Sequence, residues 1–229
     1  MREQHTVNVN GLTLSYVVDG PETAPAVVLV HGHGADADDW SAIVDDLARD
    51  HRVHALTQRG HHGSDWAPEY SFAHSAADIA GFVSALGLDE VVLVGHSLGG
   101  IAAVFTARRR PSWLSKLVLE ETPVPTPGWF SRVPPTRPEA ATNDWDHIAP
   151  KLEHELMNPD PGWWPGLAAI DVPTLVIAGG EESGFPQHNI TGVDAVIPNC
   201  HVETIPVGHL VHAAAPQRFL AVLRDFLAS

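Results

Sequence analysis

The sequence has little cysteine, little positive charge and no long apolar runs. Cys200 is the only cysteine among the 229 residues, so no disulfide can form within the chain. Lysine and arginine number 13 against 28 aspartates and glutamates, which gives a formal net charge of −15. A field of that sign repels nucleic acids and anionic membrane surfaces, so neither is an expected partner. No apolar stretch approaches the length of a transmembrane helix.

The composition that remains is typical of a soluble globular enzyme. Hydrophobic residues make up 44% of the chain and charged residues 18%. Residues 1–229 are enough for one sizeable core, and no linker-like stretch divides them, so a single domain is expected. The first residues pass into an alternating strand pattern without an apolar leader, which favours a cytoplasmic location.

The most informative stretch is Val-Val-Leu-Val-Gly-His-Ser-Leu-Gly-Gly at residues 91–100. Its apolar, β-branched start predicts a buried strand, and a helical pattern follows it. Ser97 lies at the turn between them, in the arrangement G-x-S-x-G that suits a sharp strand-to-helix turn. Such a turn exposes the serine hydroxyl beside the N-terminus of a helix, where an anion is stabilised. Ser97 is therefore a candidate nucleophile.

This strand, turn and helix resemble the α/β-hydrolase family, and the resemblance extends over nearly the whole chain. It implies an α/β fold with a mostly parallel eight-stranded sheet flanked by helices and a small lid insertion. Residues 122–166 are the candidate lid because they are rich in proline and tryptophan and contain one predicted helix, Trp145 to Met157. The alternative is a surface loop packed by its own aromatic side chains. Trp129, Trp145 and His96 are expected to line the substrate pocket.

A serine needs a base and a third group that orients this base. His209 follows the last predicted strand in the Gly-His context that the family uses, with His212 as the competitor. The resemblance leaves two candidates for the acid, Glu182 after the strand at residues 174–178 and Glu120 after the strand at residues 117–119. We favour Glu120, because a glutamate that leaves a buried strand needs a cationic partner such as an imidazolium. Glu121 or Glu182 is then expected to be solvated or salt-bridged.

A second motif, His31-Gly32-His33-Gly34, follows the predicted strand at residues 26–30. In the family that the chain resembles, the corresponding loop supplies one N–H of the oxyanion hole. This implies that His33 and Leu98 donate their backbone N–H groups. The pairs His31/His33 and His61/His62 also allow a metal site, but no carboxylate or cysteine accompanies them at ligand spacing, so no metal is expected.

Two further expectations concern local contacts. Asp38 and Asp39 precede a helical pattern that includes Trp40, and they are candidate N-caps. The loop of residues 58–65 resembles the Arg-Gly-x-Gly-x-Ser stretch of the family, with one histidine inserted, and Arg59 is expected to pair with Asp65 and hold the loop.

These features predict a serine hydrolase that cleaves a small, fairly apolar carboxylic ester or lactone through an acyl-enzyme, without a cofactor. Hydrolysis of a C–C bond or thioester, or perhydrolysis, would use the same groups. A ligand receptor on the hydrolase fold is the non-catalytic alternative. The sequence leaves the oligomeric state open.

Overall fold

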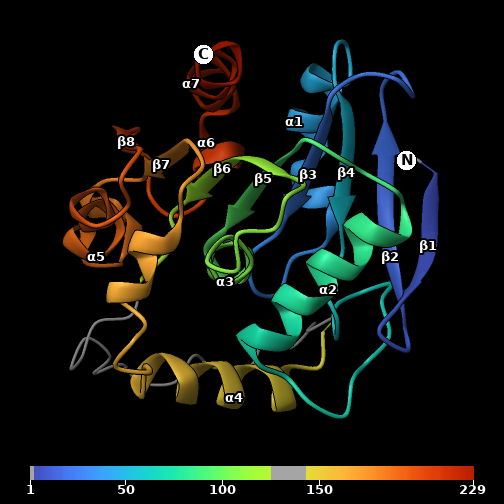
Figure 1. Cartoon of the computed structure of the whole chain (residues 1–229), viewed down its shortest axis with the longest axis horizontal. Coiled ribbons are helices and arrows are strands. Elements are labelled where there is room, and N and C mark those ends of the chain that lie inside the picture. The colour runs from blue at the N-terminus through green and yellow to red at the C-terminus, as the bar shows by residue number, and fades with distance from the viewer. Residues whose placement is uncertain (1–2, 125–142) are drawn as a thin grey trace.

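The computed structural model describes residues 3–124 and 143–229, which form an eight-stranded sheet in the order β1-β2-β4-β3-β5-β6-β7-β8 (Figure 1). The strands are β1 (Gln4–Val9), β2 (Leu12–Asp19), β3 (Ala26–Val30), β4 (Arg52–Leu56), β5 (Val91–His96), β6 (Leu114–Glu120), β7 (Thr174–Ala178) and β8 (Cys200–Thr204). The pairs β1/β2 and β2/β4 are antiparallel, and all other neighbours are parallel. The predicted mostly parallel eight-stranded sheet is confirmed.

The antiparallel part begins with a hairpin at Asn10 and Gly11. Both residues have positive φ angles, 53° and 81°, as the two central residues of a type I′ turn require. Asparagine and glycine tolerate this backbone region better than other residues. The Asn-Gly pair therefore sets the register in which Val9 faces Leu12.

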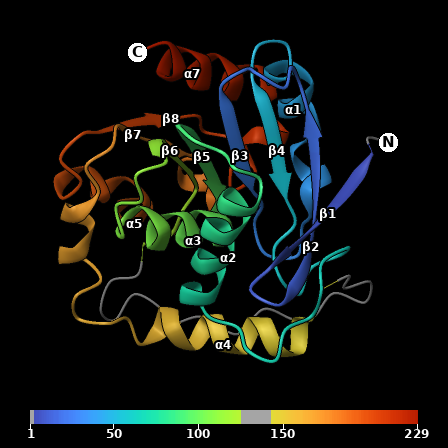
Figure 2. The same ribbon diagram turned by 45° about the vertical axis from the view of Figure 1, so that its right-hand side comes forward.

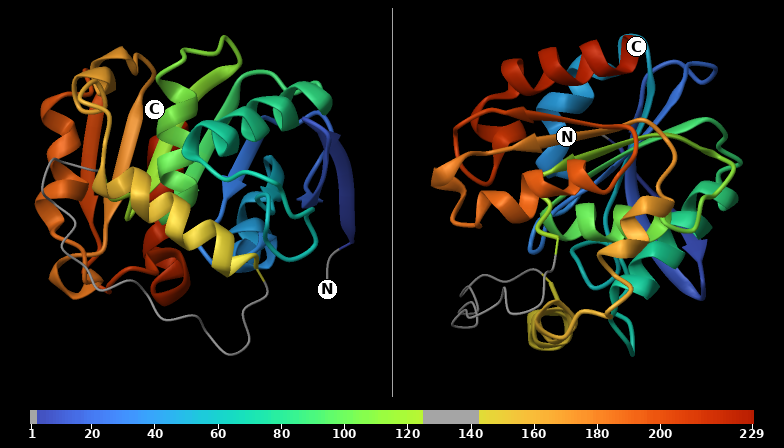
Figure 3. Two further views of the ribbon diagram at one scale, coloured as in Figure 1. Left: turned by 90° about the horizontal axis from the view of Figure 1, so that it is seen from below. Right: turned by 60° about the vertical axis from the view of Figure 1, so that its left-hand side comes forward.

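Helices cover both faces of the sheet (Figures 1 and 2). One face carries α1 and α7, and the other carries α2, α3 and α5, while α4 crosses one end of the molecule (Figure 3). The α-helices are α1 (Ser41–Leu47), α2 (Phe72–Ala85), α3 (Ser97–Ala107), α4 (Trp145–Met157), α5 (Gln187–Thr191), α6 (Val211–Ala214) and α7 (Pro216–Ala228). The 3₁₀ turns are η1 (Ala37–Trp40), η2 (Pro165–Ala169), η3 (Glu181–Ser183) and η4 (Gly192–Ala195).

The central strands are apolar along their whole length because both of their faces are covered. In β3, Val28 and Val30 join the apolar cluster under α2 and α3, whereas Val27 and Leu29 join the cluster under α1 and α7. This alternation follows from the two-residue period of a strand. Two apolar clusters, one on each face, therefore stabilise the sheet. The loops that carry the candidate site residues follow the carboxyl ends of its strands.

Two local expectations are wrong. The turn before α1 is capped by Asp36, whose side chain accepts from the N–H of Asp38, so neither Asp38 nor Asp39 is the cap. Arg59 does not pair with Asp65 but forms a buried, two-pronged ion pair with Asp78 of α2, with N···O distances of 2.5 and 2.8 Å. Asp78 could not be predicted as the partner from the sequence, because it lies on the next helix and meets Arg59 only through packing.

In the candidate lid, α4 covers the predicted residues Trp145 to Met157. Its start is attached to the body of the protein, since the N–H of Asp144 donates to the carbonyl of Gly60 and the hydroxyl of Tyr70 donates to the Asp144 carboxylate. Trp129 lies outside the described residues. Within residues 3–124 and 143–229, no helix is long and apolar enough to cross a membrane.

Candidate active site

Ser97 is the first residue of α3 and follows β5 directly. Its φ of 50° is in the left-handed region, which non-glycine residues seldom occupy, so the turn is strained. A Cβ on Gly99 would overlap the carbonyl oxygens of Val30 and His31, and a Cβ on Gly95 would overlap the backbone of α3. Both glycines are therefore required by close packing at the turn, as the G-x-S-x-G pattern predicts.

The loop after β3 passes beside this serine. A Cβ on Gly32 would lie 3.4 Å from the Cβ of Ser97. Histidines hold the loop: the N–H of Gly34 donates to Nε2 of His61, and the N–H of Gln58 donates to Nε2 of His31. A ring nitrogen that accepts from an amide carries no proton, so both imidazoles are neutral. Burial lowers the pKa of each of them, consistent with this role.

His209 is oriented by Glu121. Its Nδ1 lies 3.2 Å from Oε2 of Glu121, which is fully buried. A carboxylate only accepts, so Nδ1 carries the proton and Nε2 is free to act as a base. The other Glu121 oxygen accepts from the N–H of Gly179, and Gln187 lies 3.5 Å from the same oxygen. These contacts fix the carboxylate in place.

The partner of His209 is therefore neither of the two expected glutamates. The carboxylate of Glu120 faces the other side of β6 and contacts His212 at 2.7 and 2.9 Å. Glu182 is exposed on η3 and makes no hydrogen bond to His209 among the described residues. The physical argument for Glu120 was sound, because the buried carboxylate does have an imidazole partner, but that partner is His212.

Glu121 was missed because strand periodicity alone does not say which of two adjacent glutamates faces the loop of His209. Glu121 is the first residue after β6, and its φ of 43° turns the chain away from the strand direction. Its side chain consequently reaches Gly179 at the end of β7 and His209 beyond β8. The one available signal was its position immediately after a buried strand.

His96 connects the strand that precedes the serine to the loop of His209. Its Nε2 donates to the carbonyl oxygen of His209 at 2.9 Å, and its Nδ1 is buried without a partner among the described residues. Burial, opposed by the charge of Glu120, lowers the pKa of His96 to about 4, so the ring is neutral at pH 7. His96 is thus a neutral, buried neighbour of both Ser97 and His209.

Trp145, the first residue of α4, stacks on His33 with ring centroids 4.4 Å apart. The contact places the start of the candidate lid directly on the loop that is expected to supply an oxyanion N–H. Burial, together with the neighbouring His31, lowers the pKa of His33 to about 4, so its ring is also neutral. Leu98, the other expected donor, is buried at the start of α3.

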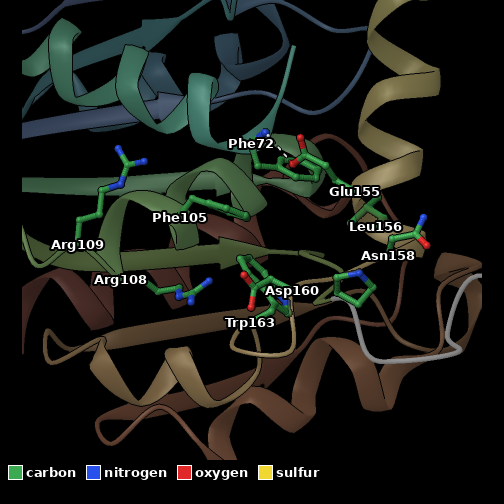
Figure 4. A pocket seen from close by; sticks show the side chains of 10 residues that line it. Phe72, Phe105, Arg108, Arg109, Glu155, Leu156, Asn158, Asp160 and Trp163 are labelled. Atoms are coloured by element: carbon green, nitrogen blue, oxygen red, sulfur yellow. Dashed lines mark hydrogen bonds between the residues drawn. The ribbon is translucent and has the colours of Figure 1, made fainter. Parts of the chain in front are cut away.

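A cleft of about 500 Å³ lies away from these groups, at the far end of α3 (Figure 4). Phe105 of α3 lines it together with Arg108 and Arg109, which directly follow this helix, and with Phe72 of α2 and Trp163. Arg108 lies 5.0 Å from the ring centroid of Trp163. Since Ser97 begins α3 and these residues lie at or just beyond its last turn, the cleft is separated from the serine by most of the helix.

In the described ranges, no group of three or more histidine, cysteine, aspartate and glutamate side chains is arranged to hold a metal ion. His31 and His61 are already engaged by backbone groups. The histidine pairs thus have a structural explanation in the loop that passes Ser97.

The strand-turn-helix at Ser97, the sheet order and the placement of His209 define the hydrolase class, and residues 25–165 match the alpha/beta hydrolase fold family. The chain belongs to this family and is a hydrolase. It is 26% identical to a 3-oxoadipate enol-lactonase of Acinetobacter baylyi, covering 100% of this chain and 99% of the relative. An sn-1-specific diacylglycerol lipase of Mus musculus is also 26% identical, over 98% of this chain and 88% of the relative.

Solved structures agree on the fold. The enol-lactonase of Burkholderia xenovorans superposes with a TM-score of 0.81 at 22% identity, over 98% of this chain and 100% of the other. A membrane phospholipase A superposes with a TM-score of 0.83 at 23% identity, over 99% and 86% of the two chains. These similarities place the fold, whereas the substrate has to be argued from the site.

Proposed function

We propose that this protein is a serine hydrolase that cleaves a small, fairly apolar carboxylic ester or lactone through the triad Ser97, His209 and Glu121. The observation that carries the proposal is the buried Glu121 carboxylate, which fixes the proton of His209 on Nδ1 and leaves Nε2 as the base. A receptor that had lost catalysis would have no need to bury a carboxylate for this purpose.

The reaction proceeds in two steps. Ser97 Oγ attacks the carbonyl carbon and forms the C–O bond, while its proton passes to Nε2 of His209. The proton then moves to the leaving alkoxide, the C–O bond to the alcohol breaks, and the acyl-enzyme remains. Water attacks this ester with His209 again as the base, and the carboxylic acid is released with Ser97 restored. Glu121 stabilises the imidazolium that forms in each step.

The backbone N–H groups of His33 and Leu98 form the oxyanion hole in this proposal. The neighbourhood of Gly32 and Ser97, and the position of Leu98 at the start of α3, support the assignment. Donors of this kind act on charge that develops in the transition state, and removal of one typically costs about a hundredfold or more in kcat. Neither step requires a cofactor.

The substrate is proposed to be small and apolar for two reasons. Residues 122–166 are proposed as a lid over the site, with Trp145 stacked on His33 and His96 buried beside Ser97. Because the imidazoles of His33 and His96 are neutral at pH 7, they offer no cationic partner to an anionic substrate. The names of two relatives, an enol-lactonase and a diacylglycerol lipase, both refer to the cleavage of carboxylic ester bonds.

The test combines a fluorophosphonate probe with p-nitrophenyl esters of short and medium chain length and with aliphatic lactones. Wild-type protein is expected to be labelled on Ser97 and to turn over at least one ester or lactone. Ser97→Ala is expected to lose both signals, while Ser15→Ala keeps them, because Ser15 is a buried serine on β2, which β4 and β3 separate from β5. Absence of labelling in the wild type, or labelling that persists in Ser97→Ala, would refute the proposal.

A further inference from the structure

His212, a buried histidine close to His209, lies between the carboxylates of Glu120 and Asp39. Nδ1 of His212 lies 2.7 and 2.9 Å from the two oxygens of Glu120, and its Nε2 lies 3.2 Å from Oδ2 of Asp39. The backbone N–H of His212 also donates to Glu120, at 2.7 Å. The side chain of His212 is 1% exposed and that of Glu120 is 0% exposed. Nothing in the triad mechanism uses these three groups.

The geometry favours a positive charge on His212. Nδ1 contacts the Glu120 carboxylate, which only accepts, so this nitrogen carries a proton. Nε2 makes no hydrogen bond among the described residues, but it lies 3.2 Å from Oδ2 of Asp39, whose negative charge stabilises a proton there. The ring also stacks on Trp40 with centroids 4.2 Å apart, an arrangement that favours a cation. Burial by itself would lower the pKa of His212, but the neighbouring carboxylates of Glu120 and Asp39 raise it to about 9.

The cluster is attached to the active site on two sides. Glu120 precedes Glu121 at the end of β6, and His212 lies in α6 directly after the loop of His209. His96 packs against both histidines, with ring centroids 4.8 Å from His209 and 5.2 Å from His212. A displacement of His212 would therefore move His209 relative to Glu121.

We propose that His212, held as a cation between Glu120 and Asp39, is a positioning residue that fixes the loop of His209 against Glu121. The proposal rests on the proposed function, since it assigns how the base of that reaction is held. His212 touches none of the reacting atoms and acts through His209.

A consequence is a limit on activity at alkaline pH. A neutral His212 can donate from only one nitrogen, so the other faces a carboxylate with a lone pair and repels it. The groups that face this cluster are Glu120 on β6, Asp39 on η1, His96 on β5 and His31 after β3. Of these, His96 and His31 have pKa values lowered mainly by burial, so they stay neutral in the alkaline range. A general base acts in its unprotonated form, so base catalysis by itself gives no alkaline limb.

The test is the pH profile of kcat for wild type and Asp39→Asn. Asparagine keeps the shape of the side chain but removes one of the two charges that raise the pKa of His212. The alkaline midpoint of kcat is expected near the His212 value of about 9 in the wild type. In Asp39→Asn it is expected to fall by about one pH unit, with the acid limb unchanged. NMR of labelled histidine on the wild type is expected to show His212 doubly protonated at neutral pH.

The matched control is Glu203→Gln, which removes the carboxylate of the exposed pair that Glu203 forms with His201 at 2.7 Å. Its pH profile is expected to coincide with that of the wild type. An unshifted alkaline limb in Asp39→Asn, or a singly protonated His212 at neutral pH, overturns the proposal. If Asp39→Asn fails to fold, a wild-type NMR midpoint of His212 that differs from the kcat midpoint by more than about one unit overturns it.

Failure of the proposed function is recognised separately. Wild-type protein that is not labelled at Ser97 at neutral pH refutes the triad and this proposal together. Normal labelling and turnover with an unshifted profile in Asp39→Asn refutes only the role of His212.

Discussion

Nδ1 of His209 lies 3.2 Å from Oε2 of Glu121, although the two residues are separated by 88 positions in the sequence. The neighbouring Glu120 has a different partner, His212, on the opposite side of β6. Two adjacent glutamates thus contact two different histidines. The division predicts that substitutions at the two positions have different kinetic effects.

Glu121→Gln is expected to lower kcat by about a thousandfold or more, because the neutral amide neither fixes the tautomer of His209 nor stabilises its cation. KM is expected to change little, since Glu121 is buried away from the substrate. Steady-state kinetics on an ester identified with the wild type measure both parameters. Glu182→Gln is the matched control, and its kcat is expected to stay within about twofold because the side chain is exposed. The reverse ranking would assign the acid to Glu182.

Trp145→Ala is expected to weaken substrate binding. Loss of the stacking contact with His33 weakens the attachment of α4 by on the order of 1 kcal/mol. Since Trp145 is proposed to line the substrate pocket, KM is expected to rise by up to about fivefold. Trp66→Ala serves as the control because Trp66 is 61% exposed. An unchanged kcat/KM in Trp145→Ala would show that the start of α4 does not contribute to substrate binding.

Asp78→Asn is expected to destabilise the protein by about 3 to 5 kcal/mol, because it leaves the buried guanidinium of Arg59 without a counter-charge. Urea unfolding measures the free energy directly. Asp171→Asn breaks the exposed pair of Asp171 with Arg110 and is expected to cost less than about 1 kcal/mol. Equal losses in the two variants would contradict the assignment of Arg59 and Asp78 as a structural pair.

Stability is expected to be greatest near neutral pH. Burial lowers the pKa of His54 and His96 from 6.5 to about 4, so the unfolded chain binds protons first as the pH falls through this range. Each of them then lowers the free energy of unfolding by on the order of 1 kcal/mol per pH unit.

Above pH 6.5 the free energy of unfolding is expected to fall as the pH rises. The pKa of His212 is raised from 6.5 to about 9, so the native state keeps a proton that the unfolded chain has lost. The stability from this proton is complete below pH 6.5 and disappears as the pH rises to about 9. Chemical denaturation across this range tests both limbs, and a free energy of unfolding that still rises above pH 6.5 would contradict the alkaline one.

The fold could be predicted from local signals in the sequence. Continuous apolar runs such as residues 26–30 predict strands buried on both faces, and the Asn10-Gly11 pair predicts the first hairpin. The pattern around Ser97 predicts the strand, the strained turn and the helix in which the structure places it. Each of these signals is local, because a short stretch of chain carries both the pattern and its physical cause.

The pairing of the charged groups could not be predicted from the sequence, because it depends on how distant elements pack. Glu121 rather than Glu120 reaches His209, Asp78 rather than Asp65 pairs with Arg59, and Asp39 contacts His212 instead of capping a helix. These partners come from different strands and helices, and their contacts depend on how the chain turns at the end of each strand. A pairing of buried charges is required by the cost of desolvation, but the identity of each partner is set by the packing that brings distant elements together.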